Sequence, residues 1–454
     1  MPGQQHVIDV TAAIERARFG RFQFLITALC ALIALLDGFD TQAIAYVAPV
    51  IAEQWGMSVA GFGPIFGAGL AGLTVGAFIL SPAADRFGRK SIILLSMLIF
   101  GVFSLVTAWA GTMNELLIYR FLTGVGLGGA MPNIIALTSE YAPARLRATL
   151  VTVMFCGFPF GSTVGGVISA PLIAAYGWQS VFIVGGVAPL AVLLVLIVWL
   201  PESLRYLVAS GAPRERIGGI LKRLDPEHAS RIDAGTGFVL HEPKATGFTV
   251  AKLFQEGRAR TTLLLWAAFF MNLLVMYFLV NWLPSLLRAS GMPIGTAILS
   301  TAVLNLGGVV GAIALGRMID RMNPHLVLGS AYAASALFIV GVAFGSHDLW
   351  LLMPAVFLAG FGVVGAQIGM NALAAGIYPT AIRSTGVGWA LGIGRIGSII
   401  GPVAGGALLG AGWSAQGVVL AAVGPALLAS LAVFALRRHP VPSGALKASA
   451  TLAH

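Results

Sequence analysis

Long apolar stretches follow one another along almost the whole chain, and this pattern limits the fold more than any other feature. A helix needs about 20 predominantly apolar residues to cross the hydrocarbon core of a bilayer. Stretches of that length lie near 22–49, 60–84, 91–110, 114–138, 149–175, 180–200, 261–287, 293–316, 326–345, 350–376, 386–410 and 416–436. The sequence therefore predicts an all-α integral membrane protein with twelve transmembrane helices.

The composition excludes a soluble fold for most of the chain. Of the 454 residues, 58% are hydrophobic and only 10% are charged, whereas about 25% of a soluble domain is charged. The first 21 residues are polar and charged, without a short apolar segment that ends in a small-residue cleavage site. We therefore do not expect a cleaved signal peptide.

The positions of Lys and Arg test the number of spans. An even number places both termini on one side of the membrane, together with the loops near 85–90, 139–148, 201–260, 317–325 and 377–385. These segments hold 24 of the 27 Lys and Arg residues, and the opposite loops hold only Arg288. Cytoplasmic loops are enriched in Lys and Arg, so we expect a multi-pass membrane protein with both termini in the cytoplasm. The net charge of +10 then faces anionic lipid and does not indicate a nucleic-acid-binding surface.

The second half of the chain repeats the first. At an offset of 235 residues, Gly72 corresponds to Gly307, Gly76 to Gly311, and the pair Asp85-Arg86 to Asp320-Arg321. At an offset that is one residue longer, the pattern P-x-x-x-R-x-T occurs at 143–149 and again at 379–385. A duplication in the same orientation predicts two parallel repeats with a binding site near the midplane between the halves.

The repeat also predicts the domain organisation. We expect a cytoplasmic N-terminal tail (1–21), a first six-helix bundle (22–200), a cytoplasmic central loop (201–260), a second six-helix bundle (261–436) and a cytoplasmic C-terminal tail (437–454).

Two carboxylates interrupt the first apolar stretch, in the segment LLDGFDTQAIAYVAP. An Asp at the bilayer centre costs about 2.5 to 3.5 kcal/mol. Glu115 lies at the outer end of its stretch and is counted with the outer loop, so of 17 acidic residues only Asp37 and Asp40 lie well inside a span. None of the seven His residues does. The spacing i, i+3 puts both acids on one helix face, and burial disfavours the charged form of a carboxyl group. We expect these acids to bind and release a proton inside the membrane; the alternative is a helix break at Gly38 that exposes both to outer water.

Arg120 and Arg395 are the basic residues inside the spans. At 1.5 Å per residue, Arg120 lies about 9 Å from the outer end of its span, and Asp37 lies about 22 Å from the inner end of its own. In a core about 30 Å thick these depths nearly coincide, so Arg120 can pair with an acid, and we also count it among the candidate substrate-binding residues. Arg395 lies about 14 Å along its span, with no acid at that level in its half. Its planar guanidinium suits a substrate carboxylate, and capping of backbone carbonyls is the alternative.

Other side chains of the spans are weaker candidates for substrate contacts. Gln367 and Asn371, at spacing i, i+4, could hydrogen-bond a ring hydroxyl or could hold helices together, and Asn272 has the same two interpretations. Trp389 and Phe158 could stack on an aromatic ring or could simply pack. The two Cys residues do not indicate a disulfide or a metal site, and we expect no cofactor.

Several motifs resemble one large family of transporters. SPAADRFGRK (81–90) resembles the signature G-x-x-x-D-R-x-G-R-K of the major facilitator superfamily, with Ser81 where Gly is usual, and GRMIDRMNPH (316–325) is a weaker copy. RFLTGVGLGGAMP (120–132) and PESLRYL (201–207) also agree with that superfamily. Within it, DGFD together with residues 139–161 and 365–397 is similar to the aromatic acid:proton symporter family.

This resemblance implies a symporter of the bacterial inner membrane, and not an enzyme, that imports an aromatic carboxylate with protons by alternating access. A hydroxybenzoate or protocatechuate is the substrate class that it implies, and the expected partners are the aromatic acid, protons and the lipid bilayer. It also implies a charged network on the cytosolic loops that latches one state. For this network we select Asp85, Arg86, Gly88, Arg89, Glu140, Arg147, Asp320, Arg321, His325 and Arg383.

Three alternatives have different sequence signals. A sugar, organic-anion or drug carrier would share the fold, but sugar porters usually carry a P-E-T-K-G-R-like motif after the last helix, where this chain reads LRRHPVPSG. A membrane-embedded enzyme would need an intramembrane His, Cys pair or H-E-x-x-H motif, and the spans contain none of these. A nutrient receptor could keep the whole fold, and only accumulation of substrate against a gradient separates it from a carrier.

Overall fold

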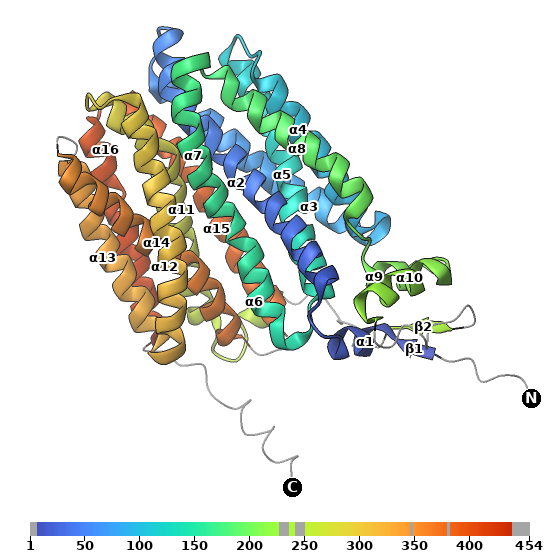
Figure 1. Cartoon of the computed structure of the whole chain (residues 1–454). Coiled ribbons are helices and arrows are strands. Elements are labelled where there is room, and N and C mark those ends of the chain that lie inside the picture. Colours follow the sequence, from blue (N-terminus) through green and yellow to red (C-terminus); the bar gives the residue numbers. More distant parts are fainter. Residues whose placement is uncertain (1–6, 227–235, 241–249, 346–347, 379–381, 438–454) are drawn as a thin grey trace, which may run out of the picture. The chain divides into compact units, whose positions relative to one another are not determined.

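The computed structural model describes residues 7–226, 236–240, 250–345, 348–378 and 382–437, and these are mostly helical (Figure 1). Six membrane-length spans come from the first half of the chain. They are α2 (Arg21–Gln54), η1 with α3 (Val59–Gly61 and Phe62–Phe87), α4 (Arg89–Thr107), α5 (Met113–Tyr141), α6 with α7 (Ala144–Phe155 and Gly157–Tyr176) and α8 (Gln179–Trp199).

The second half supplies six more. They are α11 (Ala259–Ala289), α12 (Ile294–Arg321), α13 (Pro324–Phe344), α14 (Leu349–Ile377), α15 (Arg383–Gly410) and α16 with α17 (Ala415–Ala421 and Val423–Arg437). All twelve are long and apolar enough to cross a membrane, which confirms the predicted number of spans.

The helices extend beyond the apolar stretches at several ends. The end of the signature, at 85–90, was expected to be a loop, but α3 continues to Phe87 and α4 begins at Arg89, so only Gly88 separates the two helices. A helix does not have to end where its apolar residues end, because charged side chains at its ends can reach the aqueous face.

The N-terminal segment and the central segment contain structure of their own. β1 (Val7–Asp9) pairs in parallel with β2 (Gly237–Val239), and α1 (Val10–Arg16) follows β1 directly. Figure 1 shows this pair beside α9 (Leu204–Ala209) and α10 (Arg214–Leu224). The central segment ends with η3 (Val250–Leu253). The expected tail over residues 1–21 is therefore partly folded, and Val10 and Ile14 are buried at 0% and 2% exposure.

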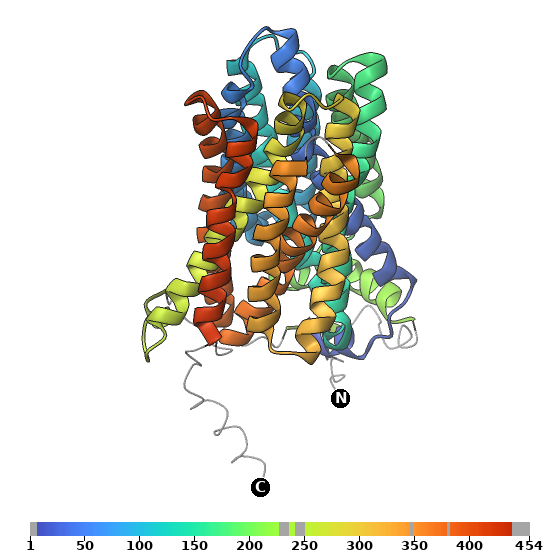
Figure 2. The same cartoon turned by 90° about the vertical axis from the view of Figure 1, so that its left-hand side faces the viewer.

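Contacts divide the chain into two compact units. Unit 1 comprises Met1–Thr41, Ala71–Gly161 and Gln179–Thr246, and unit 2 comprises Gln42–Leu70, Ser162–Trp178 and Gly247–His454. In unit 2, α13 packs against both α14 and α17, which belong to the orange-to-red helices of Figure 2. The units divide α2, α3 and α7 between them. Two bundles bounded at residues 200 and 261 stay a prediction from the repeat, and the expected C-terminal tail beyond residue 437 lies outside the described residues.

Pairs of glycines make the same close contact in both halves of the chain. A Cβ at Gly72 or Gly76 of α3 would lie 2.0 Å from a backbone carbonyl oxygen of α5. A Cβ at Gly307 or Gly311 of α12 would lie 2.1 or 2.2 Å from a backbone carbonyl oxygen of α14. Only glycine permits such close backbone approach, which is how helices pack in a membrane. The repeat seen in the sequence thus has a matching repeat of helix packing.

Candidate functional site

A buried ion pair joins α2 to α5 in unit 1. Nη2 of Arg120 lies 2.9 Å from Oδ2 of Asp40 and 3.0 Å from the backbone oxygen of the same residue. Asp40 is 0% exposed and Arg120 is 2% exposed. The pairing of Arg120 with an acid of the first span, expected from depth alone, is present in the structure, and Asp40 is the acid that forms it.

Two further helices complete the surroundings of this pair. The hydroxyl of Ser104, on α4, donates to Oδ1 of Asp40. Cζ of Arg120 lies 5.6 Å from the ring centroid of Phe182, on α8, as in a cation–π contact. Buried charges persist when they are paired and hydrogen-bonded. The charges of Asp40 and Arg120 thus link α2 to α5, with α4 and α8 beside them.

The second acid lies one turn earlier on the same helix. Asp37 is 1% exposed, and its Oδ1 accepts a hydrogen bond from the hydroxyl of Thr41 at 3.0 Å. The helix α2 runs without interruption through Gly38, so the alternative of a break there with both acids in outer water is wrong. A Cβ at Gly38 would lie 1.9 Å from the backbone oxygen of Phe158 on α7. Glycine in the D-G-x-D motif thus serves close helix packing and not a break.

Arg395, on α15, lies beside a phenol and not beside an acid. Its Nη1 lies 3.3 Å from the hydroxyl of Tyr277 on α11. Within the described ranges, no carboxylate lies within ion-pair distance of Arg395. A half-buried guanidinium with several donors still available is suited to a carboxylate ligand.

Two side-chain amides meet between α11 and α14, and a third lies one turn further along α14; we call Asn272, Gln367 and Asn371 the amide triad. Nδ2 of Asn272 donates to Oε1 of Gln367 at 2.6 Å. Gln367 and Asn371 lie one turn apart on α14, where residues at i and i+4 are neighbours on one face. The side-chain oxygens of Asn272 and Asn371 are buried and have no hydrogen-bond partner in the described structure. The structure thus brings Asn272 into contact with Gln367, a predicted substrate contact that lies one turn from Asn371.

The aromatic candidates have different surroundings. The ring of Trp389 is stacked on that of Trp266, with centroids 5.8 Å apart and planes inclined by 21°, and Trp389 remains 37% exposed. Phe158 contacts Gly38 through its backbone and is half-buried.

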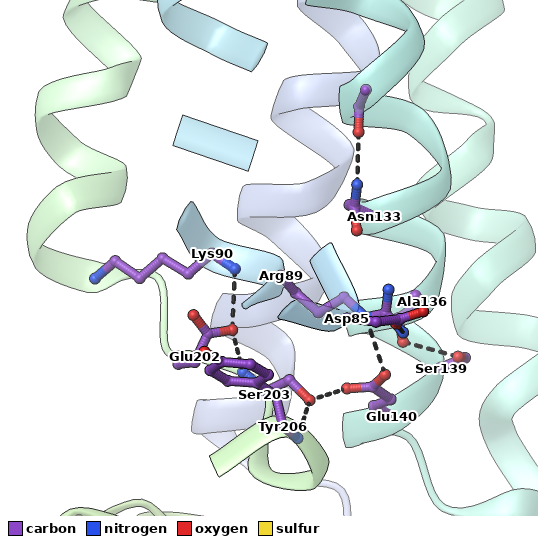
Figure 3. Close-up of polar contacts among 11 residues, drawn as sticks. Asp85, Arg89, Lys90, Asn133, Ala136, Ser139, Glu140, Glu202, Ser203 and Tyr206 are labelled. Atoms are coloured by element: carbon purple, nitrogen blue, oxygen red, sulfur yellow. Dashed lines mark hydrogen bonds and ion pairs between the residues drawn. The ribbon is translucent and has the colours of Figure 1, made fainter. Parts of the chain in front are cut away.

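Charged side chains meet at the ends of α3, α4 and α5 (Figure 3). Nη2 of Arg89 lies 3.1 Å from the carboxylate of Asp85, and its Nε lies 3.4 Å from that of Glu140. The hydroxyl of Ser203 donates to the other oxygen of Glu140. We call Asp85, Arg89, Glu140 and Ser203 the charged cluster. Three of its members were predicted, whereas Ser203 belongs to the PESLRYL motif, to which the sequence assigned no contact.

Gly88 has a specific role beside this cluster. Its φ of 92° lies in the region that favours glycine, and a Cβ there would lie 2.3 Å from Oε2 of Glu202. Glu202 accepts a hydrogen bond from the backbone N–H of Lys90 at 3.0 Å. Arg86 takes part through its backbone oxygen, which accepts from the hydroxyl of Tyr206 at 3.1 Å. The glycine of the signature is thus required by its backbone conformation, and the Glu202 carboxylate occupies the space beside it.

Arg147, which was grouped with these residues, pairs with the N-terminal segment. Its Nη2 lies 2.8 Å from a carboxylate oxygen of Glu15 on α1. Glu15 was not selected from the sequence, because it lies in a segment that was expected to be a tail. A signal was present, since Val10 and Ile14 at spacing i, i+4 mark an apolar face on the same short helix.

The repeated P-x-x-x-R-x-T loop makes the same contact twice. Arg147 donates from Nη2 to the backbone oxygen of Ala142 at 3.4 Å, and Arg383 donates from Nε to that of Tyr378 at 3.4 Å, five residues back in each case.

Burial raises the pKa of the Tyr378 phenol, so its hydroxyl stays protonated and donates a hydrogen bond to Oγ1 of Thr262 at 3.2 Å.

The weaker copy of the signature in unit 2 does not repeat the ion pairs. Asp320 and Arg321 lie exposed at the end of α12, and neither forms an ion pair within the described part of the chain. His325 is the second residue of α13, so one His does lie at the end of a span, contrary to expectation. Its backbone N–H donates to the side chain of Asn323, which caps the helix.

Metal-binding groups are absent from the described residues, since no three His, Cys, Asp or Glu side chains are grouped as ligands. Cys30 and Cys156 are both free thiols.

Comparisons with known proteins agree with these features. The model of a family described as the Major Facilitator Superfamily matches residues 30–346 and 265–453. The chain is similar to the 4-hydroxybenzoate transporter PcaK of Pseudomonas putida, with 43% identity over 428 residues that cover 94% of this chain and 95% of that protein. It is also similar to a gallate transporter of Pseudomonas putida, with 44% identity over 429 residues and the same coverage of 94% and 95%. Among solved structures, the inward-open xylose transporter XylE from E. coli has the same fold, with a TM-score of 0.71, 18% identity, and coverage of 90% of this chain and 95% of that one.

Proposed function

This chain belongs to the Major Facilitator Superfamily, and from that membership we propose that it is a proton-coupled symporter that imports an aromatic carboxylate. Its relatives are transporters, so the chain is a transporter and not an enzyme. Two relatives that match nearly its full length are named for 4-hydroxybenzoate and gallate. These names support a hydroxybenzoate, protocatechuate or related hydroxylated benzoate as the substrate. The likeness to XylE at 18% identity concerns the fold alone, and no residue described above favours a sugar or a drug.

The observation that carries proton coupling is the fully buried pair of Asp40 and Arg120, with Asp37 one turn away on α2. Ionisable groups inside a membrane are expensive and usually functional. A carboxylate that alternates between an ion pair with Arg120 and a protonated state can couple proton binding to a change in helix packing. We assign the proton-coupling role to Asp37 and Asp40. Arg120, first counted among the substrate ligands, is assigned to coupling through Asp40.

The substrate carboxylate is assigned to Arg395. Its guanidinium presents a planar fork of donors, and the Tyr277 hydroxyl at 3.3 Å can add one more. Gln367, Asn371, Trp389 and Phe158 remain proposed substrate contacts.

The charged cluster, with Arg86 and Gly88, is assigned a gating role. Ion pairs that lie at helix ends are readily broken and reformed, so they can stabilise one of two states without a large stability cost. Asp320, Arg321, His325, Arg147 and Arg383 are proposed to act with them in alternating access. We further propose that the protein lies in a bacterial cytoplasmic membrane with both termini in the cytoplasm, as the placement of Lys and Arg favours.

The deciding experiment is uptake by proteoliposomes that contain the purified protein. A pH gradient, acid outside, should drive accumulation of radiolabelled 4-hydroxybenzoate, and an uncoupler should abolish it. Glucose, which has neither an aromatic ring nor a carboxylate, and acetate, which has a carboxylate without an aromatic ring, serve as control substrates. A receptor with this fold would bind the acid without accumulating it. Accumulation that an uncoupler leaves unchanged would contradict proton coupling while leaving transport intact.

A further inference from the structure

We infer that the amide triad is a binding subsite for the ring hydroxyl of the substrate. This inference rests on the proposed function, because it supposes that an aromatic acid is transported. It adds a recognition element that separates hydroxylated from unsubstituted benzoates.

The hydrogen bonds within the triad leave part of its capacity unused. Each primary amide offers two N–H donors and one oxygen with two lone pairs. The one bond within the triad, from Asn272 to Gln367, uses a single donor and a single lone pair. The oxygens of Asn272 and Asn371 remain buried without a partner in the described structure.

Such a deficit indicates a ligand, because buried polar groups in proteins almost always have partners. Asn133 in unit 1 also has an unpaired oxygen, but its amide donates only to the backbone of its own helix. The triad differs because it has two unpaired oxygens, from α11 and α14, around one inter-helix hydrogen bond. Asn272 is 1% exposed and Gln367 is 9% exposed, so a ligand there would exchange hydrogen bonds in a nearly dry site.

The chemistry of the triad fits a neutral hydroxyl. A phenolic O–H donates one hydrogen bond and accepts another, and the triad presents unpaired oxygens beside spare N–H groups. A carboxylate only accepts hydrogen bonds, so the amide oxygens would repel it. The carboxylate therefore belongs at Arg395, whose partner Tyr277 lies on the same helix as Asn272. These two α11 residues are separated by about 7.5 Å along the helix axis, at a rise of 1.5 Å per residue, a length similar to that of a benzene ring with a substituent at each end.

The test compares two ligands that differ by one hydroxyl group. Binding of 4-hydroxybenzoate and of benzoate is measured by calorimetry on the purified full-length protein in nanodiscs. The parent should bind 4-hydroxybenzoate at least about tenfold more tightly, the factor expected for a hydrogen bond made in a buried site. Gln367→Met and Asn371→Ala should remove most of this preference and change benzoate affinity by less than about threefold.

The variants are chosen so that a structural role gives a different result. Asn371→Ala removes an unpaired oxygen and leaves the bond between Asn272 and Gln367 in place. Asn305→Ala is the matched control, because Asn305 is a buried amide of unit 2 that donates only to the backbone of its own helix, at 3.0 Å. Its removal should leave the preference unchanged.

Several outcomes would overturn the subsite, and one of them would also overturn the proposed function. A parent protein that binds the two acids equally, or Gln367→Met and Asn371→Ala proteins that keep the full preference, would remove the triad from recognition. Equal weakening of both acids would assign the triad to helix packing. A folded parent that binds no aromatic acid at all would overturn the proposed function together with the subsite.

Discussion

One carboxylate oxygen of Glu15 lies 2.8 Å from Nη2 of Arg147, and the other accepts a hydrogen bond from the backbone N–H of Ala144 at 2.7 Å. Ala144 is the first residue of α6, and the first N–H groups of a helix have no partner within it. A negative charge there also interacts favourably with the helix dipole. Glu15 therefore attaches the connection between α5 and α6 to the N-terminal segment.

We expect Glu15 and Arg147 to be energetically coupled. Their side chains are 36% and 37% exposed, so water screens the pair, and the coupling energy should be only about 0.2 to 1 kcal/mol. Thermal unfolding of Glu15→Ala, Arg147→Ala and the double variant measures this coupling. Arg16 is the control partner, because its guanidinium donates to the backbone of its own helix. A coupling no larger than that between Glu15 and Arg16 would mean that the ion pair does not stabilise the protein.

Gly38→Ala should destabilise the protein. The new Cβ would lie 1.9 Å from the backbone oxygen of Phe158, and a backbone atom cannot move aside as a flexible side chain can. Overpacking of this kind costs about 1 to 3 kcal/mol. Gly219→Ala is the matched control, since nothing lies within 4 Å of a Cβ at that position of α10 and alanine is favoured in a helix by about 0.5 to 1 kcal/mol. An unchanged melting temperature for Gly38→Ala would rule out the close approach of α2 and α7.

Asp40→Asn should have two separable effects. It leaves the buried Arg120 without its counter-ion, which costs about 3 to 5 kcal/mol, so the melting temperature should fall. The double variant Asp40→Asn/Arg120→Gln removes both charges and should recover most of that stability. Neither variant should regain accumulation driven by a pH gradient, because no carboxylate remains at position 40.

The Asp37→Asn variant allows proton coupling to be separated from substrate transport. Asp37→Asn keeps the pair of Asp40 and Arg120, so it should fold normally and lose proton-driven accumulation. Exchange of labelled for unlabelled 4-hydroxybenzoate, which needs no net proton movement, should survive in it. If both single variants accumulate substrate normally and remain sensitive to an uncoupler, the proton is carried elsewhere.

The sequence predicted the membrane fold because its signals are long and redundant. Twelve apolar stretches, the placement of Lys and Arg, and the repeat all depend on many residues, and the matched family and the likeness to XylE confirm the major facilitator fold. Helix rise alone also brought Arg120 level with the acids of α2. It did not select between Asp37 and Asp40, because they lie one turn apart and the ends of the spans were known only to within a similar distance.

The contacts at the helix ends were harder to predict for a different reason. Ser203 and Glu202 approach α4 and α5 only when the segment after α8 folds back, and no periodic pattern in the sequence reports such a fold. Glu15 was missed because a short polar helix looks like a tail until Val10 and Ile14 are read as its buried face. The amide triad shows the same limit, since Asn272 and Gln367 are 95 residues apart and meet only through helix packing.

Asp85→Asn should slow transport without changing which acids compete. The carboxylate of Asp85 lies 3.1 Å from Arg89 and is 74% exposed, so its loss shifts the balance between states and leaves the substrate contacts intact. The initial rate of uptake should fall, while the rank order of competing aromatic acids stays the same. Asp348→Asn, a helix-capping acid of unit 2, is the control and should keep a normal rate. A changed rank order with a normal rate would place Asp85 in substrate selection and not in the gate.

Arg395 is expected to bind the substrate carboxylate, so replacing it should weaken substrate binding. Arg395→Lys keeps the positive charge but loses the planar two-point fork, and a lost charge-assisted hydrogen bond of about 1.5 to 3 kcal/mol weakens binding roughly ten- to a hundredfold. Arg120→Lys should instead disturb the dependence of uptake on the proton gradient, because Arg120 pairs with Asp40 and not with the substrate. Arg288→Lys is the control, since Arg288 forms an exposed pair with Glu53 at 3.1 Å. Calorimetry in which Arg395→Ala binds 4-hydroxybenzoate as tightly as the parent would remove this residue from the substrate site.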